Sequence, residues 1–343
     1  MRARHVTHPF RCYGSFVRFE DVIGQERVVD GLARAVKSGH VPHAYLFEGP
    51  RGVGKRGTAL GLALALTCAD APGRGCGVCE SCRRIEAGLH PDVPTFAPDG
   101  AQLVIEQAKA IVALAQSRPH EAPVRVIIVD DADALNASAA NSLLKTLEEP
   151  APRNHLVLCT SAPERLLPTI RSRSQRVRFR ALAEAALLRI ATAHGIEPAR
   201  AAVAVALGDG SAARMLTAAR DDDGAAWQAI AALRAAVAAP GITPALDAAS
   251  GLASDKENKA ALPPLVALLA RLYRDALVTS AGAPELALFA DRAQELAALP
   301  PARLLRALDA IVEADAALVA NVNPTLALER LLVELRRRER SAA

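Results

Sequence analysis

A glycine-rich stretch at residues 49–56 has the residue types and the spacing needed to bind a phosphate group. It reads GPRGVGKR and fits seven of the eight positions of the phosphate-binding pattern G-x-x-x-x-G-K-[ST]. The glycines are Gly49, Gly52 and Gly54. They let backbone N–H groups point into one concavity at the start of a helix, where Lys55 adds a compact positive charge. The last position should carry a hydroxyl that binds Mg²⁺, but the guanidinium of Arg56 cannot bind a metal ion.

Polar residues follow two further apolar runs. Asp130 and Asp131 come directly after the β-branched run at residues 124–129, and Thr160 ends the run at residues 155–160. At the carboxyl edge of a parallel sheet, Asp130 would hold the water shell of Mg²⁺ and Asp131 would replace the glutamate that usually activates water. The hydroxyl of Thr160 would orient a water molecule near the γ-phosphate. The alternatives are an acidic turn before the next helix and an ordinary turn after Thr160.

Four of the six cysteines lie close together in the chain. They are Cys68, Cys76, Cys79 and Cys82. Their spacing lets a knuckle direct the thiolates to one tetrahedral centre, and four thiolate ligands leave no open coordination position. The cluster therefore predicts a structural Zn²⁺ site, with chance clustering as the alternative. A cytosolic setting favours a metal over disulfides.

The composition indicates a globular protein of more than one domain. The chain has 343 residues, of which 51% are hydrophobic, 23% are charged and 3% are aromatic. A net charge of +4 is too small to indicate nucleic-acid binding by itself. No apolar run reaches the roughly 18 residues of a membrane-spanning helix, and the first residues lack the apolar core of a secretory signal. We therefore expect a cytoplasmic protein with no membrane partner.

The periodicity of apolar residues predicts strands alternating with helices as far as residue 180, and helices alone beyond it. The expected strands lie at residues 44–48, 90–96, 124–129, 155–160 and 177–179, and the expected helices at residues 27–37, 58–67, 105–115 and 136–149. At Gly24 and Gln25 we expect either the start of a helix or a lip over the adenine of a nucleotide.

Composition changes divide the chain into four parts. We expect a flexible leader at residues 1–17, a nucleotide-binding α/β domain at residues 18–180 with the zinc module at 68–82, a three-helix lid at 181–222, and a helical domain at 223–343. The last two parts are Ala-rich, so their cores should be packed from small residues.

Several stretches resemble the bacterial clamp-loader branch of the AAA+ ATPases. They are HAYLFEGP at 43–50, the four-cysteine module, NSLLKTLEEP at 141–150, and IRSRS at 170–174, in which Ser174 replaces the cysteine of the branch's Ser-Arg-Cys motif. The resemblance runs from Phe19 to about Leu216. It implies an α/β fold: an AAA+ P-loop domain with a parallel five-stranded sheet, a small helical lid and an all-α C-terminal collar domain. It also implies ATP with Mg²⁺, weakened here by Arg56, and structural zinc.

Departures from the family pattern imply a subunit that serves its neighbour. A motor subunit keeps a hydroxyl and a glutamate where this chain has Arg56 and Asp131, and Arg214 lies one position after the arginine that senses nucleotide. Arg173, in contrast, is intact at the position of the arginine finger. The resemblance thus implies poor ATP hydrolysis by the chain alone and a catalytic Arg173 that acts in trans on a neighbour's ATP. Its partners would be the tau/gamma and delta subunits of the loader, with the sliding clamp and primer-template DNA reached through the complex.

Other functions stay open at this stage. Within the family the alternative is a tau/gamma-like motor subunit that hydrolyses ATP. Outside it, the chain could be a self-contained ATPase or nucleotide switch that holds Mg²⁺ through water on Asp130. A zinc-dependent DNA-binding protein has less support, because Arg83 and Arg84 are the only basic residues of a recognition helix beside the cysteines.

Overall fold

The chain folds into two compact units. The computed structural model describes residues 18–98, 102–149, 151–220, 224–254, 256–320 and 322–340. The first unit is Met1–Glu197 with Gly208–Ala213, and the second is Pro198–Leu207 with Arg214–Ala343. The leader expected at residues 1–17 lies outside the described residues. The division of the helical part into a lid and a collar stays a prediction.

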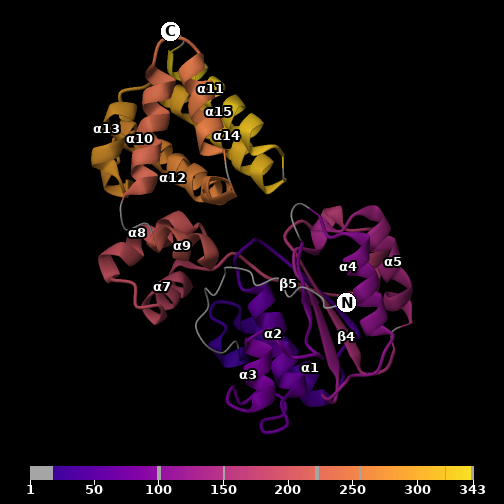
Figure 1. The fold of residues 1–343 in the computed structure, drawn as a ribbon. Helices are drawn as coiled ribbons and strands as arrows, with labels where there is room; N and C mark the ends of the chain where they lie inside the picture. The colour runs from indigo at the N-terminus through magenta and orange to yellow at the C-terminus, as the bar shows by residue number, and fades with distance from the viewer. Residues whose placement is uncertain are drawn as a thin grey trace. The chain divides into compact units, whose positions relative to one another are not determined.

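The first unit is a parallel sheet with helices on both faces (Figure 1). Its strands are β1 (Ala44–Glu48), β2 (Thr95–Phe96), β3 (Arg125–Val129), β4 (Asn154–Thr160) and β5 (Gln175–Arg178). Its α-helices are α1 (Glu26–Ser38), α2 (Lys55–Thr67), α3 (Glu80–Glu86), α4 (Ile105–Ala115), α5 (Ala137–Glu148), α6 (Pro168–Arg173) and α7 (Glu184–Ala193). Short 3₁₀ helices lie at Phe19–Asp21, Ala132–Ala134 and Pro163–Arg165. The strand order is β2-β3-β4-β1-β5 and every pairing is parallel, which confirms the expected α/β fold.

The central strands are buried on both faces. Every residue of β1 and β3 is buried, as near-continuous apolar runs in a parallel sheet require. One face packs Leu46, Ile127 and Leu158 against Ile111 of α4 and Leu143 of α5. Helix α2 contacts β3 and β4 on the other face, and α1 packs on α2 (Figure 1).

Local chemistry explains where several elements begin. Helix α5 begins after Asn136, whose side-chain Oδ1 accepts a hydrogen bond of 2.8 Å from the backbone N–H of Ala139. Strand β2 is much shorter than the expected segment at 90–96, because Pro91 and Pro94 have no N–H to donate. Strand β5 begins at Gln175, two residues before the expected position.

A buried ion pair secures the end of the sheet opposite the phosphate loop. Asp92 is fully buried and accepts hydrogen bonds of 2.7, 2.8 and 2.9 Å from the backbone N–H groups of His120, Glu121 and Ala122. The Nη2 atom of Arg125 lies 2.9 Å from the Asp92 carboxylate. Although burial alone would raise the pKa of Asp92, these hydrogen bonds and the Arg125 charge hold that pKa below its usual value.

The second unit is entirely helical. Its helices are α10 (Ala225–Ala238), α11 (Thr243–Leu252), α12 (Lys256–Ser280), α13 (Ala290–Ala297), α14 (Pro301–Val319) and α15 (Pro324–Arg340), with a 3₁₀ turn at Pro284–Leu286. Most of α8 (Pro198–Gly208) and of α9 (Ala212–Ala219) also belongs to the second unit, while Gly208–Ala213 belongs to the first. Within the described residues, none of the helices is long and apolar enough to cross a membrane.

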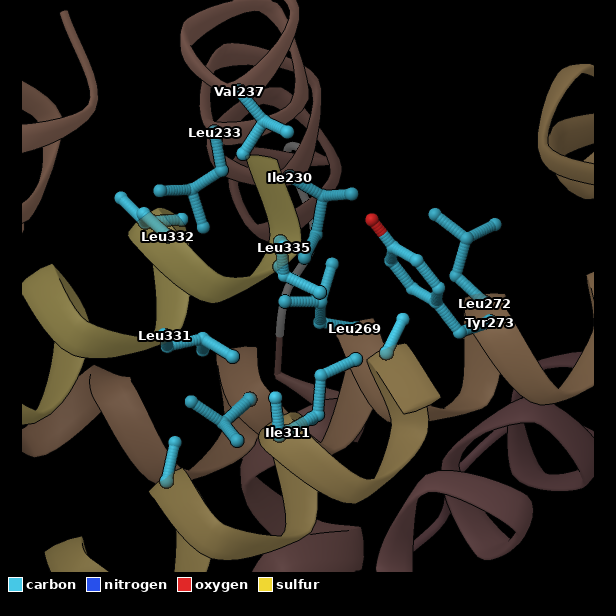
Figure 2. Packing of buried hydrophobic residues seen from close by; sticks show 14 of the residues in the cluster. Ile230, Leu233, Val237, Leu269, Leu272, Tyr273, Ile311, Leu331, Leu332 and Leu335 are labelled. Carbon is cyan, nitrogen blue, oxygen red and sulfur yellow. The ribbon is translucent and has the colours of Figure 1, made fainter. Parts of the chain in front are cut away.

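The core of the second unit joins buried residues from six helices, α10 to α15. Figure 2 shows Leu233 of α10, Leu269 of α12, Ile311 of α14 and Leu335 of α15 in one apolar cluster. Tyr273 also lies in this cluster, and its hydroxyl donates a hydrogen bond to the carboxylate of Glu339 near the end of α15. The cluster is built mainly from Leu and Ala, as the composition of this part of the chain predicts.

We expect Asp92→Ala to destabilise the first unit by about 3–5 kcal/mol at pH 7, because it leaves a buried guanidinium and three backbone N–H groups without their acceptor. The Asp92 pKa is lowered on folding, so its stabilisation is present above the unfolded pKa of about 3.9 and is lost as the pH falls through the folded value. Urea unfolding of both proteins at several pH values measures this difference. The control is Glu164→Ala, which removes an exposed carboxylate. Equal unfolding midpoints for Asp92→Ala and the wild type at pH 7 would contradict the prediction.

Candidate functional site

The phosphate loop lies between the end of β1 and the start of α2, as the sequence predicts. Gly49, Gly52 and Gly54 have φ angles of 151°, 75° and 100°, all in the region that favours glycine. Helix α2 begins at Lys55, so the N–H groups of its first turn face the loop. The loop and the helix N-terminus together form a concavity suited to an anion.

Lys55 is bound by the loop itself. Its Nζ donates hydrogen bonds of 2.7 Å each to the carbonyl oxygens of Gly49 and Pro50, and the residue is 8% exposed. Burial lowers the pKa of the ammonium group, and the neighbouring thiol and carboxylates oppose that shift. A phosphate group would have to draw Lys55 away from these two carbonyls.

Gly52 packs against the start of α9. A Cβ at position 52 would lie 2.2 Å from the Oγ atom of Ser211 and 2.7 Å from the Cβ of Ala213. The backbone N–H of Ala212 donates a 3.0 Å hydrogen bond to the Gly52 carbonyl. Glycine is therefore required at position 52 for two reasons, its positive φ and the close approach of another backbone.

The two carboxylates at the end of β3 have different surroundings. Burial and the charge of Asp131 raise the pKa of Asp130, while the positive charges of Arg56 and Lys55 oppose the rise. Asp131 has a φ of 46°, which is unusual for a residue other than glycine. Its Oδ1 lies 3.8 Å from the Nη2 of Arg51, which belongs to the phosphate loop. The structure thus brings both predicted aspartates to the loop edge of the sheet.

The hydroxyl of Thr160 is bound by a carboxylate that the sequence analysis did not single out. Thr160 is fully buried and donates a 2.7 Å hydrogen bond to the Oδ1 of Asp133, which also accepts from the N–H of Ser161 at 3.0 Å. The hydroxyl proton is therefore already used within the chain. The only sequence signal for Asp133 was its place in the acidic run that follows β3.

Glu48 is a second acidic residue that the sequence analysis missed. It ends β1, is 5% exposed, and accepts hydrogen bonds of 2.8 Å from Arg176 and Arg178 of β5. Burial opposes ionisation, but the two guanidinium groups hold the Glu48 pKa below its usual value. The sequence signal for this contact was the pair of arginines at positions 176 and 178, because alternate residues of a strand lie on the same face and can bind one acidic residue.

Arg173 is the last residue of α6 and its side chain is 36% exposed. Its Nη2 lies 2.6 Å from the Oε1 of Glu148, and its Nη1 donates a 3.3 Å hydrogen bond to the Thr169 carbonyl. Arg171, two residues earlier, is half-buried, and its Nε has no hydrogen-bond partner among the described residues. Of these two arginines, Arg173 therefore presents the more accessible guanidinium.

Two further residues singled out in the sequence, Arg214 and Gln25, bind other parts of the chain: Arg214 forms an ion pair and Gln25 binds backbone carbonyls. In the second unit, the Nη2 of Arg214 lies 3.4 Å from the Oδ2 of Asp315 on α14. In the first unit, Gln25 precedes α1, and its side-chain Nε2 donates hydrogen bonds to the carbonyls of Arg180 and Val53 at 2.7 and 3.4 Å. Gln25 is therefore a buried link between the phosphate loop and the end of β5, at the start of a helix.

The four cysteines converge as the spacing predicts. The Sγ atoms of Cys68, Cys76, Cys79 and Cys82 all lie within 4.8 Å of one another, so the cluster could hold a metal ion. Backbone N–H groups of Val78 and Cys79 donate to the Cys76 Sγ at 3.4 and 3.2 Å. These hydrogen bonds lower the pKa of Cys76 to about 7, which favours the thiolate that binds metals.

Comparison with known proteins gives matches to subunits of DNA polymerase III. Residues 24–183 match the family model described as "DNA polymerase III, delta subunit". The delta-prime subunit of DNA polymerase III from Bacillus subtilis is 40% identical over 46% of this chain and 48% of its own length. The gamma/tau subunit from Mycobacterium tuberculosis is 39% identical over 48% of this chain and 29% of its own length. The chain thus spans about half, or less, of the length of these curated relatives.

Among solved structures, a gamma-subunit-related protein of DNA polymerase III from Thermotoga maritima is similar to this chain. It has a TM-score of 0.42 and 18% identity, and the match covers 91% of this chain and 99% of that protein.

We expect Gly52→Ala to destabilise the first unit more than Gly54→Ala does. Both positions have a positive φ, which costs an alanine roughly 1–2 kcal/mol. Only position 52 adds a clash, because no atom lies within 4 Å of a Cβ built at position 54. The extra cost should be about 1–3 kcal/mol. Urea unfolding measures it, and equal costs for the two substitutions would show that the close approach to Ser211 is unimportant.

Proposed function

We propose that this chain, a member of a clamp-loader family of AAA+ proteins close to the delta-prime subunits, acts as the delta-prime subunit of a DNA polymerase III clamp loader. In this role it helps to load the sliding clamp onto primer-template DNA during replication. Its partners are the tau/gamma and delta subunits, and the work is done in the bacterial cytoplasm. The observation that carries the proposal is the accessible guanidinium of Arg173, which contrasts with the altered metal position of the chain's own phosphate loop.

In the assembled ring, Arg173 serves as an arginine finger. The γ-phosphoryl group gains negative charge on its oxygens as it is transferred, and a guanidinium from the next subunit neutralises that charge. The partial exposure of Arg173 and its place at the end of a helix support such a role. Arg176 suits it less, because its Nε and Nη2 are paired with the buried Glu48, which also binds Arg178 and ends β1 beside the chain's own phosphate loop.

The chain's own nucleotide site is impaired in hydrolysis. The N–H groups of the loop, Lys55 and Asp130 would hold ATP and the water shell of Mg²⁺, but Arg56 supplies no metal ligand. The positive charge of Arg56 opposes the rise in the pKa of Asp130. Binding of nucleotide without turnover is compatible with this arrangement.

The four cysteines hold a structural zinc ion. A tetrahedral site with Zn–S bonds of about 2.3 Å has sulfur atoms about 3.8 Å apart. The Cys68–Cys79 and Cys76–Cys82 sulfur pairs are 4.0 and 3.9 Å apart, which fits that geometry. With four thiolate ligands no coordination position is left for a substrate water, so the metal stabilises the fold and takes no part in catalysis.

A tau/gamma-like motor is the second candidate function, because gamma/tau relatives reach 39% identity over a similar part of the chain. A motor would hydrolyse ATP at ordinary AAA+ rates without partners, and Lys55→Ala would abolish that activity. Phosphate release by the isolated chain therefore distinguishes the two functions.

We expect the purified protein to contain one zinc ion per chain, and Cys79→Ser to lose the metal and unfold the module locally, since metal binding is part of the folding free energy. Elemental analysis and thiol titration measure the two effects. The control is Cys159→Ala, which removes a buried cysteine outside the cluster and should leave the zinc content unchanged. Free thiols without zinc in the wild-type protein would refute the zinc site.

We expect Arg173→Ala to leave the chain folded and able to join the complex, but to lower clamp- and DNA-stimulated ATP hydrolysis and clamp loading. Arginine fingers contribute about 10³–10⁵ in rate at the site that they serve. Arg173→Lys tests shape against charge, because lysine keeps the charge and loses the planar fork. Arg171→Ala, checked first for stability, tests the general loss of positive charge.

The measurements are steady-state ATP hydrolysis and clamp loading by the reassembled complex. A complex that contains Arg173→Ala and loads clamps at the wild-type rate would overturn the assignment of the finger.

A further inference from the structure

A carboxylate from another helix holds the guanidinium of Arg173. Glu148 is the last residue of α5, and its Oε1 lies 2.6 Å from the Nη2 of Arg173, the last residue of α6. The other terminal nitrogen, Nη1, donates to the Thr169 carbonyl at 3.3 Å. The two contacts orient both terminal nitrogens of the fork, and each nitrogen retains a second N–H.

The backbone of Arg173 is fixed separately from its side chain. Ile170 is fully buried in the core of the sheet, and the hydroxyl of the 8%-exposed Ser174 donates a 2.9 Å hydrogen bond to the Ile170 carbonyl. The Cα of Arg173 is therefore held by residues on both sides of it. The guanidinium stands at the end of a long, rotatable side chain, so its position depends on its own contacts.

Glu148 lies in the last turn of α5, where a negative charge destabilises the helix. The C-terminus of a helix carries a partial negative charge, so a carboxylate in the last turn is unfavourable. Glu149, the next residue, is also exposed, and among the described residues Arg173 pairs with Glu148 and not with it. Of these two adjacent acids only Glu148 reaches Arg173, which separates its role from that of general surface charge.

We propose that Glu148 is a positioning residue that holds the guanidinium of Arg173 for a phosphoryl group bound to the neighbouring subunit. This inference rests on the proposed role of Arg173 as an arginine finger. An oriented guanidinium loses less conformational freedom when it meets the transition state, so the contact raises the rate of hydrolysis. The pair is half-exposed, so its attraction is weak enough for the phosphoryl group to use the remaining N–H groups.

The test is Glu148→Gln in the reassembled complex, with ATP hydrolysis measured in the presence of clamp and primed DNA. We expect kcat to fall about two- to fivefold, the range of an exposed ion pair, with KM for ATP almost unchanged. The loss should shrink at high ionic strength, where the wild-type pair is itself screened. Glu149→Gln, which makes the same change of charge one residue away, should leave kcat unchanged.

The same substitution in an Arg173→Ala background separates the possible outcomes. If Glu148 acts through Arg173, Glu148→Gln has no further effect in that background. An undiminished or increased kcat for Glu148→Gln, beside a strong loss for Arg173→Ala, would overturn the positioning role and leave the finger intact. A loss that persists without Arg173 would also overturn it. If Arg173→Ala itself has no effect, the proposed function fails first.

Discussion

The buried carboxylate of Glu48 joins β1, the edge strand β5 and the phosphate loop. It ends β1 directly before Gly49, and it binds Arg176 and Arg178 of β5. An ionised carboxylate is costly to bury unless it is paired, so β5 must lie beside β1 at this register. The residue after β5 then comes so close to the loop that a Cβ at Gly49 would lie 2.4 Å from the Phe179 carbonyl oxygen. The same strand follows directly on the short helix that carries the proposed finger.

The sequence was informative wherever a signal is local. The spacing of Gly52, Gly54 and Lys55 predicts the loop, because both glycines occupy positions with a positive φ that other residues rarely adopt. The four cysteines and the apolar strands were predicted for the same reason, since a short spacing or an alternation in sequence maps directly onto a short distance in space. The parallel sheet follows from buried apolar runs separated by helices.

What could not be predicted depends on residues far apart in the chain. Glu48 meets Arg176 across 128 positions, and Thr160 meets Asp133 across 27, so neither pair leaves a spacing pattern in the sequence. The predicted role of Thr160 rested on a free hydroxyl, whereas the folded chain uses its proton in a buried hydrogen bond. The buried polar network around Asp92 could not be predicted either, because its backbone donors lie 28 to 30 positions further along the chain.

The residues of the chain's own nucleotide site and those of the proposed finger are held by different contacts. The ammonium group of Lys55 binds two loop carbonyls. The guanidinium of Arg51 lies near Asp131, after β3, and binds Ser161, after β4. Both positively charged groups therefore have partners within the chain. Arg173 depends instead on Glu148 and on the packing of α6. Among the described residues, none of the hydrogen bonds and ion pairs named above joins the two sets. Arginine at position 56, where the motif has a hydroxyl residue, can therefore weaken the nucleotide site without disturbing the contacts of Arg173. This physical independence would let the proposed finger at Arg173 act whether or not the chain's own site hydrolyses ATP.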